Sequence, residues 1–218
     1  MSTVQRGAFI VIEGLDRSGK STQAALLQSR LQNANVSVKL MKFPDRTTPV
    51  GKMIDAYLRS QSDVDDRTIH LLFSANRWEA VSSIESTLAA GTTIICDRYA
   101  FSGVAFSAAK GLPLAWCRSP DVSLPAPDLT LFLDISPDIA KSRGGYGEER
   151  YEKEELQRRV RNIFHQLGDE LPKDGAGRWA VIDAGRDLNT VSESLWHEVA
   201  ITIHDCTKQD SVGKLWQS

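Results

Sequence analysis

Residues 9–22 read FIVIEGLDRSGKST, and this stretch decides the fold class. From Gly14 to Ser21 it fits the pattern G-x-x-x-x-G-K-[ST]. That pattern indicates a phosphate-binding loop when a strand precedes it and a helix follows it. The apolar run that ends at Glu13 supplies the strand, and the amphipathic stretch from Ser21 supplies the helix. The stretch therefore predicts a strand–loop–helix unit that holds a phosphate chain.

On the C-terminal side of this unit, short apolar runs alternate with longer amphipathic stretches. Three of the five apolar runs lack polar alternation, which is typical of strands buried on both faces of a parallel sheet. The alternation predicts an α/β fold, a doubly wound five-stranded parallel sheet surrounded by helices, in a single domain over residues 1–218. The expected strands are Phe9–Glu13, Val36–Lys42, Thr92–Asp97, Leu129–Asp134 and Trp179–Asp183. The expected helices are Ser21–Asn33, Thr68–Ala89, Lys153–Leu171 and Leu188–Thr207.

The composition of the 218 residues excludes several classes of protein. A net charge of −2 disfavours a protein that binds duplex nucleic acid, because such proteins are normally basic. No apolar run is long enough to cross a bilayer, and the first residues lack a secretory pattern. Three cysteines, far apart and in no CxxC pair, argue against a disulfide scaffold or a zinc site. We therefore expect a cytoplasmic protein without nucleic-acid or membrane partners, with nuclear and mitochondrial pools left open.

The residues of the phosphate-binding loop suit its chemistry. Gly14 and Gly19 let backbone N–H groups turn onto phosphate oxygens, and the start of the following helix adds its positive end. Lys20 supplies a charge for the β- and γ-phosphates, and the Ser21 hydroxyl can ligate Mg²⁺. Arg17 can act as an arginine finger on the transferred phosphoryl group. The alternative for Arg17 is a solvated arginine on an exposed turn.

Other residues indicate a small nucleotide kinase. The chain has no Asn-Lys pair, so the guanine-reading motif of GTPases is missing. Arg46 follows the second expected strand, and Asp97 and Arg98 end the third, at strand ends where open α/β sheets bind ligands. Phe73 and Arg77 are four residues apart on one helical face, where they can stack on a base and bond to it. The alternatives are surface charge for the arginines and core packing for Phe73.

At this point the sequence resembles the thymidylate kinases of the eukaryotic type, in the P-loop nucleoside monophosphate kinase family. The resemblance covers nearly the whole chain and rests on GLDRSGKST, FPDR, LLFSANRWE, DRYAFSGVAF, PDLTLFLD, RGGYGEERYE and KLWQS. It implies transfer of the γ-phosphoryl group of ATP to dTMP, giving dTDP and ADP in dTTP biosynthesis, with Mg²⁺ as cofactor. It also implies a homodimer and a short lid at about residues 143–152.

The resemblance assigns roles to particular residues of this chain. The implied catalytic residues are Asp16, Arg17, Lys20 and Arg98. The implied ATP contacts are Gly14, Arg17, Ser18, Gly19, Lys20, Ser21, Thr22 and Arg143. The implied dTMP contacts are Asp16, Phe43, Arg46, Phe73, Arg77, Arg98, Ser102, Gly103, Phe106 and Tyr151. The implied Mg²⁺ residues are Ser21 and Asp97.

Within the implied dTMP site, Asp16 holds the sugar 3′-hydroxyl, and Arg46 and Arg98 clamp the phosphate. Phe73 stacks on thymine while Arg77 bonds to its edge. Ser102, Gly103 and Phe106 line the base pocket, and Tyr151 disfavours a ribose 2′-hydroxyl.

The transferring arginine has three candidates. Bacterial members of the family carry it in the lid, and eukaryotic members carry it in the phosphate-binding loop. The family pattern therefore favours Arg17, and it leaves open whether Arg143 or Arg150 shares the role. The alternative for Arg150 is a local ion pair with Glu148 or Glu149.

Three rival interpretations differ in acceptor or in class. A kinase for dUMP or UMP is the nearest rival, and a missing thymine methyl is worth only ~1–3 kcal/mol, so some use of dUMP is expected. A deoxynucleoside kinase needs a carboxylate base but no pair of phosphate-clamping arginines. A non-catalytic P-loop module is expected to have lost Lys20, Ser21 or the acceptor arginines, and all of them are present.

Overall fold

The structure is a computed structural model that describes residues 5–143, 149–171, 177–206 and 211–217. Within these residues, five parallel strands form one sheet in the order β2-β3-β1-β4-β5. The five-stranded parallel α/β fold is therefore confirmed, and the strand positions agree with the sequence to within two residues. The strands are β1 Phe9–Gly14, β2 Val38–Lys42, β3 Thr93–Asp97, β4 Leu129–Asp134 and β5 Arg178–Asp183.

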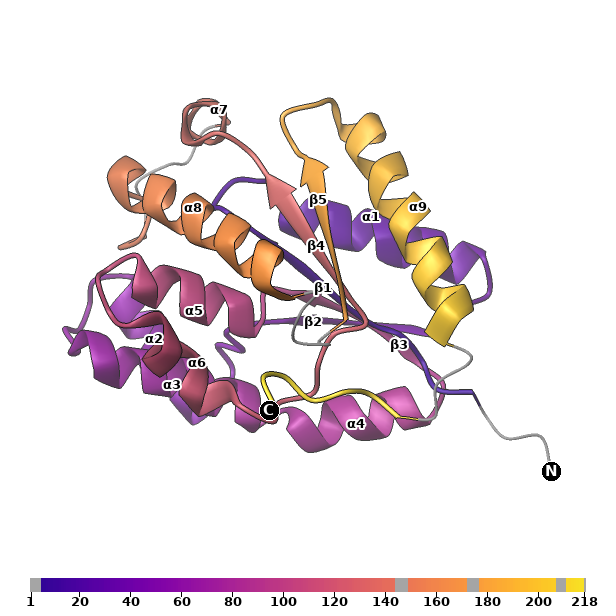
Figure 1. Cartoon of the computed structure of the whole chain (residues 1–218), viewed down its shortest axis with the longest axis horizontal. Helices are drawn as coiled ribbons and strands as arrows, with labels where there is room; N and C mark the ends of the chain where they lie inside the picture. The colour runs from indigo at the N-terminus through magenta and orange to yellow at the C-terminus, as the bar shows by residue number, and fades with distance from the viewer. Residues whose placement is uncertain (1–4, 144–148, 172–176, 207–210, 218) are drawn as a thin grey trace.

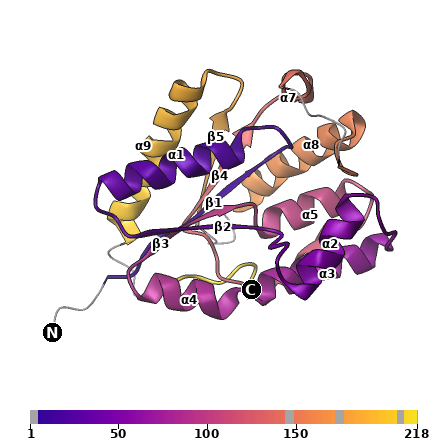
Figure 2. The same cartoon turned by 180° about the vertical axis from the view of Figure 1, so that it is seen from behind.

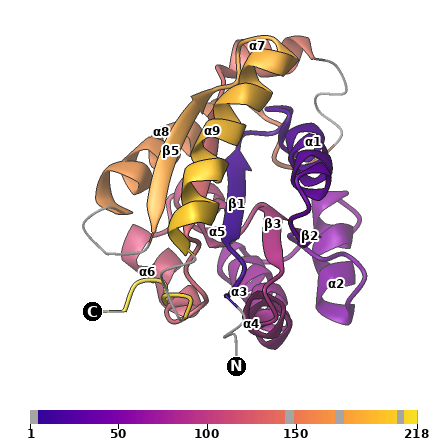
Figure 3. The same cartoon turned by 90° about the vertical axis from the view of Figure 1, so that its right-hand side faces the viewer.

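Helices cover both faces of the sheet (Figures 1 and 3). Helices α1 and α9 pack together on one face, and α5 and α8 pack together on the other. Seen from behind, α2 and α3 lie side by side next to α5 (Figure 2). The helices described are α1 Lys20–Asn33, α2 Pro49–Leu58, α3 Asp66–Trp78, α4 Val81–Ala89, α5 Ala100–Ala108, α6 Leu114–Arg118, α7 Pro137–Ser142, α8 Glu154–Glu170 and α9 Leu188–Cys206.

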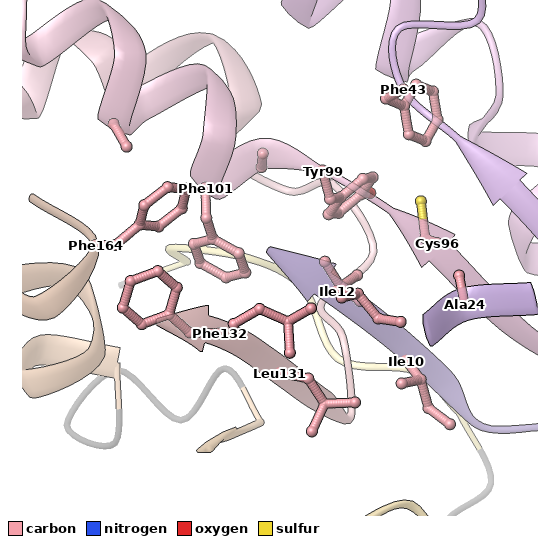
Figure 4. Packing of buried hydrophobic residues seen from close by; sticks show 14 of the residues in the cluster. Ile10, Ile12, Ala24, Phe43, Cys96, Tyr99, Phe101, Leu131, Phe132 and Phe164 are labelled. Atoms are coloured by element: carbon pink, nitrogen blue, oxygen red, sulfur yellow. The ribbon is translucent and has the colours of Figure 1, made fainter. Parts of the chain in front are cut away.

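The core lies on both faces of the sheet, where the central strands meet α5 and α8 on one face and α1 and α9 on the other. Every residue of β1 is buried, as expected for a central strand of a parallel sheet. Phe101 of α5, Phe132 of β4 and Phe164 of α8 pack together (Figure 4), with the Phe132 and Phe164 rings stacked 5.0 Å apart between centroids. Offset aromatic pairs of this kind add to the free energy gained by burying apolar area. The strand that leads into the phosphate-binding loop, β1, is therefore held in a well-packed core.

The single helix predicted over Thr68–Ala89 is wrong. The chain forms α3 and α4 instead, with a tight turn between them in which the Ala80 N–H donates to the Arg77 carbonyl at 3.0 Å. Helix α3 packs on α2 and α5, whereas α4 packs on β3. Because α3 and α4 pack against different elements, one straight helix over this range could not bury the apolar faces of both.

The C-terminal tail docks on the body of the domain. The Trp216 ring meets Phe101 edge-on at 5.8 Å between centroids, and Leu215 is fully buried. Lys214 forms an antiparallel bridge with Pro125, in the segment between α6 and β4. That segment begins with a 3₁₀ turn over Ser119–Asp121.

The structure also bears on membranes and disulfides. Among the described residues, no helix is both long and apolar enough to pass through a bilayer. All three cysteines lie in the described part of the chain, and each is buried with a free thiol.

Candidate active site

A cavity of about 420 Å³ opens at the carboxyl edge of β1, β2 and β3. The parallel register places the ends of these strands side by side, because Asp97 is paired with both Ile12 and Lys42. All ten predicted dTMP contacts line this one cavity, although they come from loops and helices far apart in sequence. Predicted loop and metal residues line it too, namely Arg17, Gly19, Lys20, Ser21, Thr22 and Asp97.

A second cavity of about 440 Å³ lies on the other side of the phosphate-binding loop. It holds two predicted ATP contacts that the first cavity lacks, Ser18 and Arg143. Arg186 and Leu188 complete this cavity, and the sequence analysis did not select them. Gly14 lines neither cavity; it lies beneath the loop, where a Cβ would come within 2.8 Å of the Leu133 carbonyl oxygen.

The phosphate-binding loop holds Lys20 by its own backbone. The Lys20 Nζ donates to the Leu15 carbonyl at 2.6 Å and to the Ser18 Oγ at 3.3 Å. Burial, together with the nearby Arg98 guanidinium, lowers the pKa of Lys20 to about 8. A polyphosphate has the opposite effect, since a nearby negative charge favours the ammonium form. The loop therefore presents a desolvated lysine that gains most from an anionic ligand.

Ser21 and Asp97 lie together, as the predicted metal site requires. The Ser21 hydroxyl donates to Asp97 Oδ2 at 2.5 Å. The other carboxylate oxygen, Asp97 Oδ1, is buried and has no hydrogen-bond partner among the described residues. Oxygen donors of this kind suit Mg²⁺, which is usually held by one or two protein groups plus phosphates and water. The described residues contain no cluster of three acidic, histidine or cysteine ligands, so a Mg²⁺ ion here would depend on donor phosphates.

Arg98 is held in place before any ligand arrives. It has a left-handed backbone, with φ of 69°, at the point where β3 turns into α5. Its guanidinium donates to the Gly14 carbonyl at 3.0 Å, to the Ser102 Oγ at 3.1 Å and to the Asp16 carboxylate. Asp16 also accepts a hydrogen bond from Gln157 Nε2 at 2.7 Å. The phosphate-binding loop, the end of β3 and helix α8 therefore meet at the ion pair between Arg98 and Asp16.

Glu13 is a site residue that the sequence analysis missed. Its side chain is fully buried at the end of β1, and burial raises its pKa. It accepts hydrogen bonds from the backbone N–H groups of Tyr99 and Ser102, at 2.9 and 3.0 Å, and from the Ser102 hydroxyl at 2.5 Å. The carboxylate thus fixes the first turn of α5 beside Arg98. The available signal was an acidic residue ending an otherwise apolar strand.

Arg46 faces the C-terminal part of the predicted lid, which includes Glu149. Its guanidinium donates to Asp55 at 2.6 Å and to Glu149 at 2.8 Å. The sequence analysis did not give Asp55 or Glu149 a role at this site. An acceptor phosphate that binds Arg46 must compete with these two carboxylates.

Arg77 and Phe73 lie at the far end of the cavity. Arg77 is almost fully buried. Its guanidinium donates hydrogen bonds to the Asp121 carboxylate, from Nη2 at 2.6 Å and from Nε at 3.2 Å. A Cβ on Gly103 would lie 2.8 Å from Arg77 Nη2, so glycine leaves room for the guanidinium. Phe73 is half-buried and lines the cavity. Asp121 was also missed, because a partner 44 residues away leaves no local signal.

The two other candidate arginines lie apart. Arg143 Nη1 donates to the Arg17 carbonyl at 3.2 Å and Nη2 to the Ala184 carbonyl at 2.6 Å, which places it beside the phosphate-binding loop. Arg150 instead donates to Asp63 at 2.7 Å and to the Tyr57 carbonyl at 2.9 Å. The ion pair of Arg150 is therefore formed with a distant carboxylate and not with adjacent Glu149. Residues 144–148 of the predicted lid, which include Glu148, lie outside the described residues.

Comparisons with known proteins agree with this geometry. A sequence model of the family described as thymidylate kinase matches residues 12–195. The chain is 50% identical over 217 residues to the thymidylate kinase of Arabidopsis thaliana, covering 100% of this chain and 80% of the relative. It is 45% identical over 214 residues to that of Homo sapiens, covering 98% and 99%. A solved thymidylate kinase from Candida albicans superposes with a TM-score of 0.85 at 39% identity, covering 96% and 98%. The chain therefore belongs to the thymidylate kinase family of nucleoside monophosphate kinases.

Proposed function

We propose that this chain transfers the γ-phosphoryl group of ATP to dTMP, giving dTDP and ADP for dTTP synthesis. The observation that carries the proposal is one cavity that joins a phosphate-binding loop to two arginines and an aromatic end. The donor enters from the side of Arg143, and the acceptor lies between Arg46, Arg98 and Phe73. We also propose that the chain acts as a single kinase domain whose segment 143–152 closes over the donor.

The acceptor needs no general base. A phosphate monoester has a second pKa near ~6, so at neutral pH its oxygen is already a nucleophile. The remaining obstacle is repulsion between two anions. Arg17, Lys20, Arg46 and Arg98 line the same cavity and offset that charge. Catalysis then consists of positioning and electrostatic stabilisation in a closed cleft, from which water must be excluded to prevent ATP hydrolysis.

Each group has a defined task in the proposal. Lys20 binds the β- and γ-phosphates, and Arg17 contacts the phosphoryl group as it is transferred. Ser21 and Asp97 would hold Mg²⁺, which would neutralise charge on the donor phosphates. The Asp16 carboxylate accepts a hydrogen bond from the sugar 3′-hydroxyl and is positioned by the hydrogen bond from Gln157.

We propose that the protein is a homodimer in the cytoplasm, with nuclear and mitochondrial pools left open. Leu71 and Trp78 are seven residues apart on α3, so they share a face, and both are exposed, by 47% and 40%. Met53 of the neighbouring α2 is 53% exposed. These exposed apolar side chains on the two packed helices support α2 and α3 as the proposed subunit interface. Free thiols are typical of a reducing compartment.

An acceptor panel tests the proposal. The full chain is supplied with ATP and Mg²⁺, and ADP release is measured with dTMP, dUMP, UMP, thymidine and no acceptor. We expect dTMP to give the highest kcat/KM, dUMP to follow with a loss of about 10–200-fold for the missing methyl, and thymidine to give no more than the background. ADP release that is faster with thymidine, or that is independent of acceptor, would overturn the proposal.

Replacement of Phe73 with alanine should raise the KM for dTMP about tenfold or more and leave the KM for ATP unchanged, since stacking on a base contributes ~1–3 kcal/mol. Leu72→Ala is the matched control, because Leu72 is also half-buried on α3 but does not line the cavity. Steady-state kinetics with each substrate varied in turn make the measurement. An equal loss of affinity for both nucleotides would show that Phe73 is a packing residue.

A further inference from the structure

Lys110 is a half-buried lysine to which the proposed mechanism gives no task. It follows α5 directly, and its side chain is only 12% exposed. Its Nζ lies 2.9 Å from the Tyr151 hydroxyl, 3.1 Å from the Tyr57 hydroxyl and 2.7 Å from Asp66 Oδ1. These acceptors come from the segment before α8, from α2 and from α3.

The ammonium group is fixed by these contacts. A lysine head has three N–H donors and no acceptor, and here three oxygen atoms surround it. Lysine is rarely buried unless its charge is paired, and Asp66 supplies the opposite charge. Both tyrosine oxygens act as acceptors, because the ammonium can only donate. Lys110 therefore ties the Tyr151 hydroxyl to α2 and α3.

Tyr151 is held on its ring face as well as at its hydroxyl. Its ring is stacked on Phe106, with centroids 5.3 Å apart and planes inclined by 24°. Tyr57 meets it edge-on at 6.0 Å. The Tyr151 carbonyl accepts from Gln157 Nε2 at 2.9 Å, and the same amide nitrogen reaches Asp16 at 2.7 Å. Tyr151 thus lines the acceptor cavity next to the group proposed to bind the sugar.

We propose that Lys110 is a specificity-determining residue that acts by positioning Tyr151, so that the ring excludes a 2′-hydroxyl on the acceptor sugar. This inference rests on the proposed function and on the implied role of Tyr151, which is to disfavour a ribose 2′-hydroxyl on the acceptor. A ring held by stacking and by a hydrogen bond from an ammonium cannot move aside for an extra oxygen atom. Without the ammonium, the ring keeps its contacts with Phe106 and Tyr57 but loses the charge-assisted hydrogen bond at its hydroxyl, and it yields to the larger sugar.

The test is a double-mutant cycle with the full chain. Lys110→Met keeps most of the aliphatic stem and removes the three donors, and Tyr151→Phe removes the hydroxyl that accepts one of them. The ratio of kcat/KM for dTMP to that for ribothymidine monophosphate is measured in the wild type, both single variants and the double variant. Lys52→Met is the matched control, because Lys52 is an exposed lysine on α2.

We expect Lys110→Met and Tyr151→Phe each to narrow the ratio about tenfold, as the loss of one charge-assisted hydrogen bond allows. In Lys110→Met the change should come from a lower KM for the ribonucleotide, with kcat for dTMP nearly unchanged. The double variant should be no worse than either single variant, because the two residues act through one contact. The control should keep the wild-type ratio.

Three outcomes would overturn the inference. One is a dTMP-to-ribonucleotide ratio that Tyr151→Phe lowers but Lys110→Met leaves unchanged. That result would keep the role of Tyr151 and remove the role of Lys110. Another is additive narrowing in the double variant. The third is an unchanged ratio in Tyr151→Phe, because the hydroxyl that accepts from Lys110 would then have no part in sugar selection. If Lys110→Met does not fold, Asp66→Ala serves instead; Asp66 is 47% exposed, and its loss should narrow the ratio about threefold.

Discussion

Replacement of Arg17 with glycine is expected to lower kcat by about 10²–10³-fold while changing the KM for dTMP only a few-fold. The guanidinium is proposed to contact the phosphoryl group most strongly as charge shifts in the transition state. Interactions that are stronger in the transition state raise kcat, whereas uniform binding lowers KM alone. Lys20 and Mg²⁺ share the stabilisation, so the loss should be smaller than for an arginine finger acting alone.

The backbone at Arg17 makes this variant informative. Arg17 has a φ of 63°, a left-handed conformation that glycine adopts more readily than arginine. The variant should therefore fold, and its melting temperature should be at least that of the wild type. The Arg17 Nε also lies 3.4 Å from Glu152 Oε1, so the side chain must exchange this partner for the phosphoryl group during the reaction.

Arg30→Ala is the matched control for Arg17→Gly. Arg30 is likewise paired with a glutamate, Glu193, at 2.6 Å, but it lies where α1 meets α9, away from both cavities. Its loss should leave kcat unchanged. A normal kcat in a folded Arg17→Gly protein would contradict the proposed role and transfer it to Arg143, which contacts the loop at the Arg17 carbonyl.

The second large effect is expected for Arg98→Met, with a loss of about 10²–10³-fold in kcat/KM for dTMP. The substitution removes one proposed clamp on the acceptor phosphate. It also leaves the Asp16 carboxylate without its ion-pair partner next to an incoming dianion. Both consequences act on the acceptor, so the KM for ATP should change much less. Steady-state kinetics and thermal unfolding of the same preparations separate binding from folding.

Arg161→Met is the matched control for Arg98→Met. Arg161 makes a bidentate ion pair with Asp134, at 2.6 and 2.8 Å, beyond the lining of the acceptor cavity. Its loss should lower the melting temperature without raising the KM for dTMP. If Arg98→Met also lost only stability, Arg98 would be a structural residue and the acceptor clamp would have to be assigned elsewhere.

The sequence predicts local features of this site well because their signals are local. The phosphate-binding loop is a contiguous stretch bounded by a strand and a helix, and the structure has β1 and α1 at those positions. Helix α5 was not predicted, because seven of its nine residues are buried and no amphipathic pattern results. Helix α2 was also missed, although Thr48 as its N-cap and Pro49 at its start were available signals.

Long-range contacts account for the other features of the structure that the sequence does not predict. Asp121 receives Arg77 from 44 residues away, and Lys110 meets Tyr151 from 41 residues away. Single-sequence patterns report which face of an element is buried, but they do not report which charged groups meet across the fold. The division of Thr68–Ala89 into α3 and α4 has the same origin, since the two helices pack on different partners.

A crystal structure of the full chain with dTMP and ADP tests the proposed site most directly. The decisive measurement is the distance from the acceptor phosphate oxygens to the guanidinium groups of Arg46 and Arg98. We predict hydrogen bonds of about 3 Å to both, with thymine stacked on Phe73 and Glu149 no longer bonded to Arg46. An acceptor phosphate bound out of reach of both arginines, with the Arg46–Glu149 and Arg98–Asp16 pairs unchanged, would contradict the proposal.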